Sequence, residues 1–100
     1  MFESDQYDMI EVTSEGGSDP LRFIVVVREG QGETRHAVML AAADFSRLGK
    51  GAKPEQLIEA AFAFLLEREP KESILSRFDL SVIARYFPEF ERELPRYLAR

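Results

Sequence analysis

The sequence contains no cysteine, no tryptophan and only one histidine among its 100 residues. Without cysteine there can be no disulfide, no thiolate ligand for zinc and no cysteine nucleophile, and the fold does not depend on an oxidising compartment. A single histidine also falls short of the ligand sets that hold transition metals. We therefore expect no cofactor and no metal.

Long hydrophobic runs are missing too. Uninterrupted apolar stretches such as residues 60–66 (AAFAFLL) are far shorter than the roughly 20 residues that a helix needs to cross a bilayer. The first eight residues, MFESDQYD, are acidic and lack the basic-then-apolar layout of a signal peptide. We expect a cytoplasmic protein that has no membrane partner.

Basic charge is scarce as well, because 13 lysine and arginine residues stand against 18 aspartate and glutamate residues, for a net charge of −5. Only residues 76–100 are mildly basic, with five arginines against four acidic residues. Binding to a nucleic-acid backbone needs several cations gathered on one surface. The composition therefore disfavours nucleic acid as the partner.

No motif typical of a catalytic centre is present. The segment GKGAK (residues 49–53) lacks the GxxxxGK[ST] spacing that wraps a phosphate. His36 is the one candidate for a general base, with Glu33 or Arg35 beside it; the alternative is a structural histidine near the rim of a hairpin. We expect a protein that is not an enzyme, and keep a small enzyme that uses His36 as a further hypothesis.

Three strand-like segments occupy the first half of the chain. Residues 7–13 (YDMIEVT) alternate imperfectly, residues 21–28 (LRFIVVVR) are rich in β-branched side chains, and residues 34–40 (TRHAVML) follow a Gly-Gln-Gly turn. The turn formers of residues 14–20 (SEGGSDP) separate the first two. This pattern predicts three antiparallel strands, of which the last two form a hairpin.

The register of this hairpin follows if Gln31 and Gly32 form a two-residue loop. The expected cross-strand pairs are then Val27 with His36, Val25 with Val38, and Phe23 with Leu40. A slip of one residue would turn arginines into the core, so the pattern resists it. The predicted core face holds Phe23, Val25, Val27, Val38 and Leu40, and the opposite face holds Arg22, Arg28 and Arg35.

The centre of the chain is an unusually apolar helix. Nine of the ten residues 57–66 (LIEAAFAFLL) are apolar, and only Glu59 interrupts them. Pro54 suits the first position of a helix and Pro70 ends it, which predicts about four turns over residues 54–69. A helix that is apolar on nearly every side must be covered on more than one side. We expect the sheet on one side, and later helices or a second subunit on the other.

Shorter helices are expected around this one. Residues 41–48 (AAADFSRL) form a helix that Gly49 ends in a left-handed conformation, and residues 72–77 form a helical turn. Asp79 is the expected N-cap of a helix over residues 80–87. A last helix begins at residue 89 and is broken by Pro95.

Together these elements predict a single α+β domain over residues 1–100. Its three-stranded antiparallel sheet (β-β-β) is followed by the central apolar helix and by two or three short C-terminal helices. One hundred residues are enough for one modest core and too few for two.

Three resemblances bear on function. Residues 65–91 (LLEREPKESILSRFDLSVIARYFPEFE) resemble part of a small, uncharacterised bacterial family, which implies no activity. Residues 80–87 (LSVIARYF) resemble the first helix of a helix-turn-helix unit, although Pro88 stands where glycine is usual and the next segment carries three glutamates. The strand-strand-strand-helix order is distantly similar to HicB-type antitoxins, which inhibit a partner ribonuclease, but their acidic and glycine-cysteine features are missing.

The C-terminal quarter interleaves aromatic residues with arginines, the residue types enriched at interface hot spots. Packing of arginine stems over aromatic rings is the structural alternative. We predict a non-catalytic bacterial protein-interaction module or homodimer, with a nucleic-acid-associated regulator as the alternative. The candidate interaction residues are Arg77, Arg85, Tyr86, Phe90, Arg92 and Tyr97.

Overall fold

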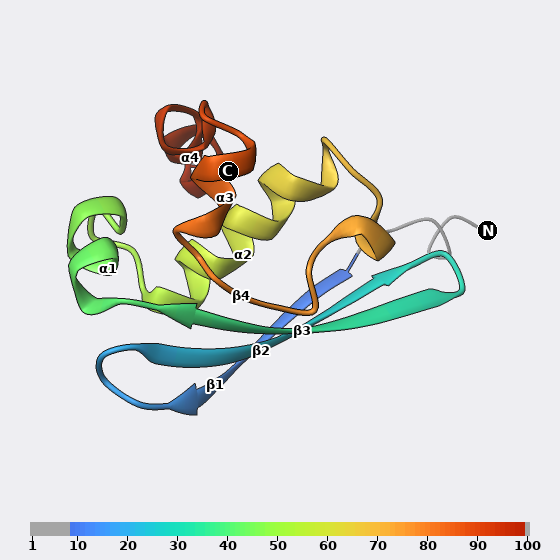
Figure 1. Ribbon diagram of the computed structural model, residues 1–100, viewed down its shortest axis with the longest axis horizontal. Helices are drawn as coiled ribbons and strands as arrows, with labels where there is room; N and C mark the ends of the chain where they lie inside the picture. Colours follow the sequence, from blue (N-terminus) through green and yellow to red (C-terminus); the bar gives the residue numbers. More distant parts are fainter. Residues whose placement is uncertain (1–8, 100) are drawn as a thin grey trace.

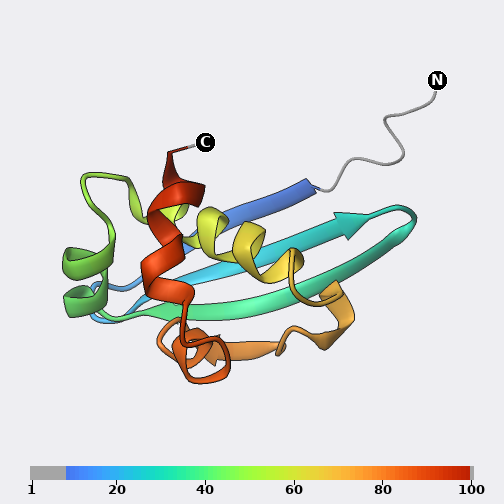
Figure 2. The same cartoon turned by 90° about the horizontal axis from the view of Figure 1, so that it is seen from above.

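The computed structural model describes residues 9–99 and confirms the α+β class. All helices lie on one face of a single sheet (Figures 1 and 2). The first strand was expected from residue 7, and residues 7 and 8 lie outside the described part. In chain order the elements are β1 (Met9–Gly16), β2 (Leu21–Glu29), β3 (Gly32–Leu40), α1 (Ala42–Leu48), α2 (Pro54–Leu66), a 3₁₀ turn (Lys71–Ser73), β4 (Arg77–Asp79), α3 (Val82–Tyr86) and α4 (Phe90–Leu98).

The sheet has four strands in the order β1-β2-β3-β4 and is mixed. The predicted antiparallel strands β1, β2 and β3 are present, but the three-residue strand β4 pairs parallel to β3. The prediction of three antiparallel strands was therefore incomplete, and residue 77 is strand rather than helical turn. Hydrogen bonds from Ala37 N to Ser76 O (2.8 Å) and from Leu80 N to Met39 O (2.9 Å) attach the segment.

The predicted hairpin register was wrong by two residues. Glu29 pairs with Gly32 and Val25 with His36, so the tight turn is formed by Gly30 and Gln31. Gly30 has a φ of 61°, a left-handed conformation that glycine adopts without strain in two-residue hairpin turns. Because the shift is even, the predicted faces hold: the five apolar residues are buried and the three arginines are exposed.

Helix α2 is covered on both sides, as predicted, and here the cover comes from the chain itself. On the sheet side the Phe62 ring lies 5.3 Å from His36 and 6.0 Å from Phe78. Phe64, two residues on and therefore about 200° around the helix, faces the C-terminal helices. Its ring centroid lies 5.9 Å from that of Phe87, 5.0 Å from Phe90 and 5.7 Å from Tyr97.

The boundaries of the shorter helices differ from prediction. Helix α3 has only five residues, and Asp79 belongs to β4, where its carboxylate accepts hydrogen bonds from Ser81 N (3.0 Å) and Ser81 Oγ (2.8 Å). Helix α4 continues through Pro95 to Leu98. The buried side chains of Leu94 and Tyr97, on either side of the proline, hold this last turn against the core.

Gly49 does end α1, but not in the predicted left-handed conformation, since its φ is −68°. A Cβ atom at this position would lie 2.7 Å from Phe45 O, so a close approach explains the glycine. The left-handed residues are the next two, Lys50 (φ 52°) and Gly51 (φ 88°). Among the helices of residues 9–99, none has the length and apolar character required to span a bilayer.

Candidate functional site

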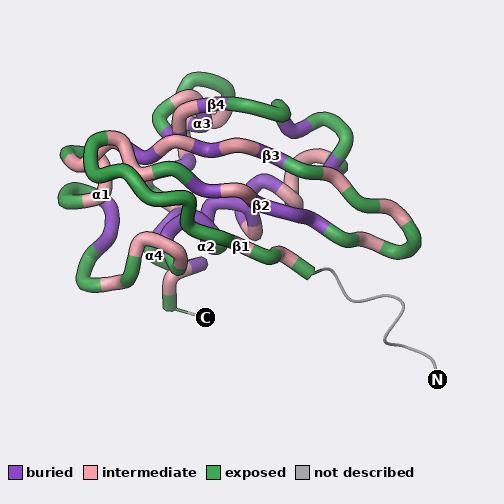
Figure 3. The backbone as a smooth tube through the Cα atoms, turned by 90° about the horizontal axis from the view of Figure 1, so that it is seen from below, coloured by how far each residue is buried: buried purple, intermediate pink, exposed green. Residues whose placement is uncertain are grey.

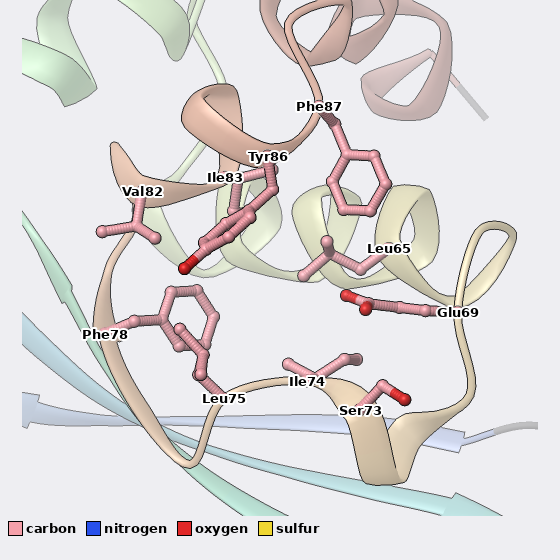
Figure 4. Close-up of a pocket in the computed structure, with 10 residues that line it drawn as sticks. All are labelled: Leu65, Glu69, Ser73, Ile74, Leu75, Phe78, Val82, Ile83, Tyr86 and Phe87. Carbon is pink, nitrogen blue, oxygen red and sulfur yellow. The ribbon is translucent and has the colours of Figure 1, made fainter.

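The described residues form a groove of about 350 Å³ on the helical side of the molecule. It opens between the C-terminal half of α2, the segment leading into β4, and α3 (Figure 4). We call it the α2–α3 groove. Its lining residues are Leu65, Glu69, Ser73, Ile74, Leu75, Phe78, Val82, Ile83, Tyr86 and Phe87.

The α2–α3 groove has a buried apolar floor and an exposed apolar rim. Leu65, Ile74 and Ile83 are at most 6% exposed. At the rim, Leu75 is 48% and Tyr86 68% exposed, and both are among the few large apolar side chains open to solvent in the described part of the chain. Large apolar side chains exposed next to a concave surface are typical of binding sites.

His36 is hydrogen-bonded to the backbone of Leu75, in the segment that forms one wall of the groove. Its Nδ1 lies 2.7 Å from Leu75 O, and its Nε2 lies 2.8 Å from Thr34 Oγ1. Because a carbonyl oxygen only accepts, Nδ1 donates this hydrogen bond. The ring is 2% exposed, so the prediction of a histidine near the hairpin rim was wrong. Both ring nitrogens are engaged, and His36 does not line the groove.

Glu69 is the one acidic side chain that lines the α2–α3 groove. Figure 4 shows its side chain crossing toward the middle of the groove, with the carboxylate between Leu65 and Ile74. This burial raises the pKa of Glu69 above the ordinary value for glutamate. In the described residues no cation lies within ion-pair distance of it.

We expect Glu69→Gln to stabilise the folded protein near neutral pH. A raised pKa means that the ionised carboxylate is less stable in the folded than in the unfolded chain, so ionised Glu69 lowers stability. The penalty is absent below the ordinary glutamate pKa of about 4.3 and develops as the pH rises through the higher folded-state pKa. Urea unfolding at acidic and neutral pH measures this. If the difference in unfolding free energy between Glu69→Gln and the wild type were the same at neutral and at acidic pH, the raised pKa of Glu69 would be contradicted.

Of the six predicted interaction residues, the structure brings only Tyr86 to the α2–α3 groove. Phe90 and Tyr97 are 1% and 7% exposed and pack against Phe64 in the core. The three arginines are exposed away from the groove lining, and whether they contact a partner stays a prediction: Arg77 is on β4, Arg85 on α3 and Arg92 on α4.

Arginine does stack on an aromatic ring in this part of the molecule, but the arginine comes from the turn that follows α2. The Arg68 guanidinium lies 3.6 Å from the centroid of the Phe64 ring. It also donates to Glu89 Oε2 (3.1 Å) and to Phe64 O (3.2 Å). Tyr97 OH donates to Glu67 Oε1 (2.6 Å) nearby. These contacts surround the aromatic cluster of Phe64 and Tyr97, and Arg68 does not line the α2–α3 groove.

The sheet face opposite the helices is the second exposed surface. Viewed from this side, buried segments concentrate in β2 and β3, while β1 is largely exposed (Figure 3). Arg28 lies on this face between Glu11 (3.1 Å) and Glu33 (2.9 Å). Positive and negative side chains thus alternate across the strands, and the face is not the continuous cationic surface that a nucleic-acid backbone requires.

Within residues 9–99, no group of three histidine, aspartate or glutamate side chains is placed to hold a metal ion. Comparisons with protein-family models, with curated proteins and with solved structures found no match. The resemblances drawn from residues 65–91 and from the strand-helix order therefore stay predictions.

Proposed function

We propose that this chain is a non-catalytic protein-interaction module, and that the α2–α3 groove binds apolar side chains of a segment of another protein. The observation that carries the proposal is the groove itself, an apolar depression of about 350 Å³ flanked by exposed Leu75 and Tyr86. Filling such a groove removes apolar surface from water, which favours binding by about 25 cal/mol for each Å² buried.

The chemistry of the lining supports binding rather than catalysis. A nucleophile needs a base within hydrogen-bond reach, yet the polar side chains at the groove are Glu69, Ser73 and the Tyr86 hydroxyl. The only histidine is held by Leu75 O and Thr34. The groove offers shape, apolar area and one carboxylate, which suits recognition.

Selection of peptides from a displayed random library tests this proposal. We expect peptides enriched on the wild-type protein to bind at least tenfold more weakly to Leu75→Asp, because apolar side chains of the peptide would lose the contact with Leu75 and would have to displace the water that solvates the new carboxylate. The matched control is Met9→Asp, which places the same charge at an exposed apolar residue of β1, outside the groove, and should leave binding unchanged. No enrichment, or equal binding to Leu75→Asp, would contradict the proposal.

Self-association through the same groove is a second candidate, because Leu75 and Tyr86 could cover each other's counterparts across a twofold axis. A second subunit is not required to cover α2, because α4 of the same chain already packs against it. Sedimentation equilibrium distinguishes the two forms. A homodimer should dissociate in Leu75→Asp and persist in Met9→Asp.

A further inference from the structure

The glutamates around the α2–α3 groove differ in their partners. In residues 67–93, five of the six glutamates are held by another side chain. These pairs are Glu67 with Tyr97, Glu72 with Lys71, Glu89 with Arg68, Glu91 with Arg47, and Glu93 with Arg96. Glu69, the one that lines the groove, has no such partner among residues 9–99. The acceptor that faces the binding surface is thus the one left available.

We infer that the groove binds an amphipathic protein segment that places a lysine or arginine on Glu69 while a neighbouring apolar side chain contacts Leu75 and Tyr86. This inference rests on the proposed function and specifies in addition that the partner segment carries a positive charge. The supporting geometry is a carboxylate set between the apolar side chains of Leu65 and Ile74 (Figure 4).

The same geometry discriminates against other segments. A wholly apolar occupant would cover the Glu69 carboxylate without pairing it, and burying an unpaired charge is costly. An acidic occupant would add a second negative charge at short range. A cationic side chain replaces the lost water with a charge-assisted hydrogen bond. The surrounding apolar walls strengthen this bond relative to one in open solvent.

Three matched peptides test the inference on the full chain. Each is acetylated and amidated and has two leucines followed by one variable residue in a serine background; the variable residue is lysine, norleucine or glutamate. Affinities are measured by NMR titration of the ¹⁵N-labelled protein. We expect the lysine peptide to bind about threefold or more tightly than the norleucine peptide, and the glutamate peptide to bind most weakly.

Two variants make the result specific. In Glu69→Gln the advantage of lysine over norleucine should disappear. In the matched control Glu59→Gln, on an exposed position of α2 outside the groove, the advantage should persist. Equal binding of the lysine and norleucine peptides to the wild type, or an unchanged preference in Glu69→Gln, would overturn the inference.

The outcomes also separate this inference from the proposed function. If the peptides shift groove resonances without any charge preference, only the charge assignment fails. If no peptide shifts groove resonances, the proposed function fails with it. If the groove resonances instead change with protein concentration alone, a second copy occupies the groove and the cationic segment is rejected.

Discussion

Phe64→Ala is expected to lower the free energy of unfolding by about 3–5 kcal/mol, the range for truncating a fully buried aromatic residue. Phe64 is 0% exposed and joins α2 to the C-terminal helices through contacts with Phe87, Phe90 and Tyr97. Removing its ring leaves a cavity between these elements and also removes the surface on which the Arg68 guanidinium stacks. Urea unfolding followed by circular dichroism measures the loss.

The matched control for this prediction is Glu59→Ala, an exposed position on the same helix. Surface substitutions of this kind change stability by less than about 0.5 kcal/mol. A loss below about 1 kcal/mol for Phe64→Ala, well under the range expected for a buried aromatic residue, would mean that α4 does not cover the outer side of α2 in solution.

His36→Leu is expected to destabilise the protein by about 2–3 kcal/mol and to loosen β4. Leucine roughly preserves the volume of the side chain but leaves Leu75 O and Thr34 Oγ1 without their partner, and a buried unsatisfied polar group costs about 1–3 kcal/mol. Hydrogen exchange should accelerate at the Ala37 and Leu80 amides, which donate to Ser76 O and Met39 O where β4 meets β3.

Thr34→Val separates the two hydrogen bonds of His36. It removes only the contact to Nε2, so we expect a loss of about 1 kcal/mol and normal protection of the Ala37 amide. If the Ala37 and Leu80 amides of His36→Leu exchanged at the wild-type rate, the hydrogen bond from His36 Nδ1 to Leu75 O would not be what attaches this segment to β3.

The features that sequence predicted well depend on local composition. The near-continuous apolar run of residues 57–66 required cover on two sides, and Phe62 and Phe64 receive it from the sheet and from α4 respectively. The faces of the hairpin were predictable because a one-residue slip would have buried arginines. Its register was not, because either pair within Gly30-Gln31-Gly32 could form the tight turn.

The features that sequence missed depend on distant contacts. Strand β4 has three residues, and its pairing with β3 relies on hydrogen bonds to residues about 40 positions earlier. The prediction that Pro95 ends the last helix failed because buried Leu94 and Tyr97 outweigh the missing N–H.

The α2–α3 groove was not predicted because its lining comes from three separate segments. In the sequence Glu69 stands between Glu67 and Glu72, a spacing typical of a solvated surface, whereas the turn after α2 directs Glu69 inward. One local signal was available: the apolar pair Ile74 and Leu75 stands within a polar stretch. In the structure one of the two is buried and the other is 48% exposed at the rim.

We expect this protein to bind its partner through the α2–α3 groove. The most direct test is a search for intermolecular nuclear Overhauser effects between a bound leucine-containing peptide and the methyl groups of the protein. We expect contacts to the methyl groups of Leu75, Val82 and Ile83. Contacts confined to Ile24 and Met39 on the opposite face of the sheet, or to Met9 on β1, would contradict the claim.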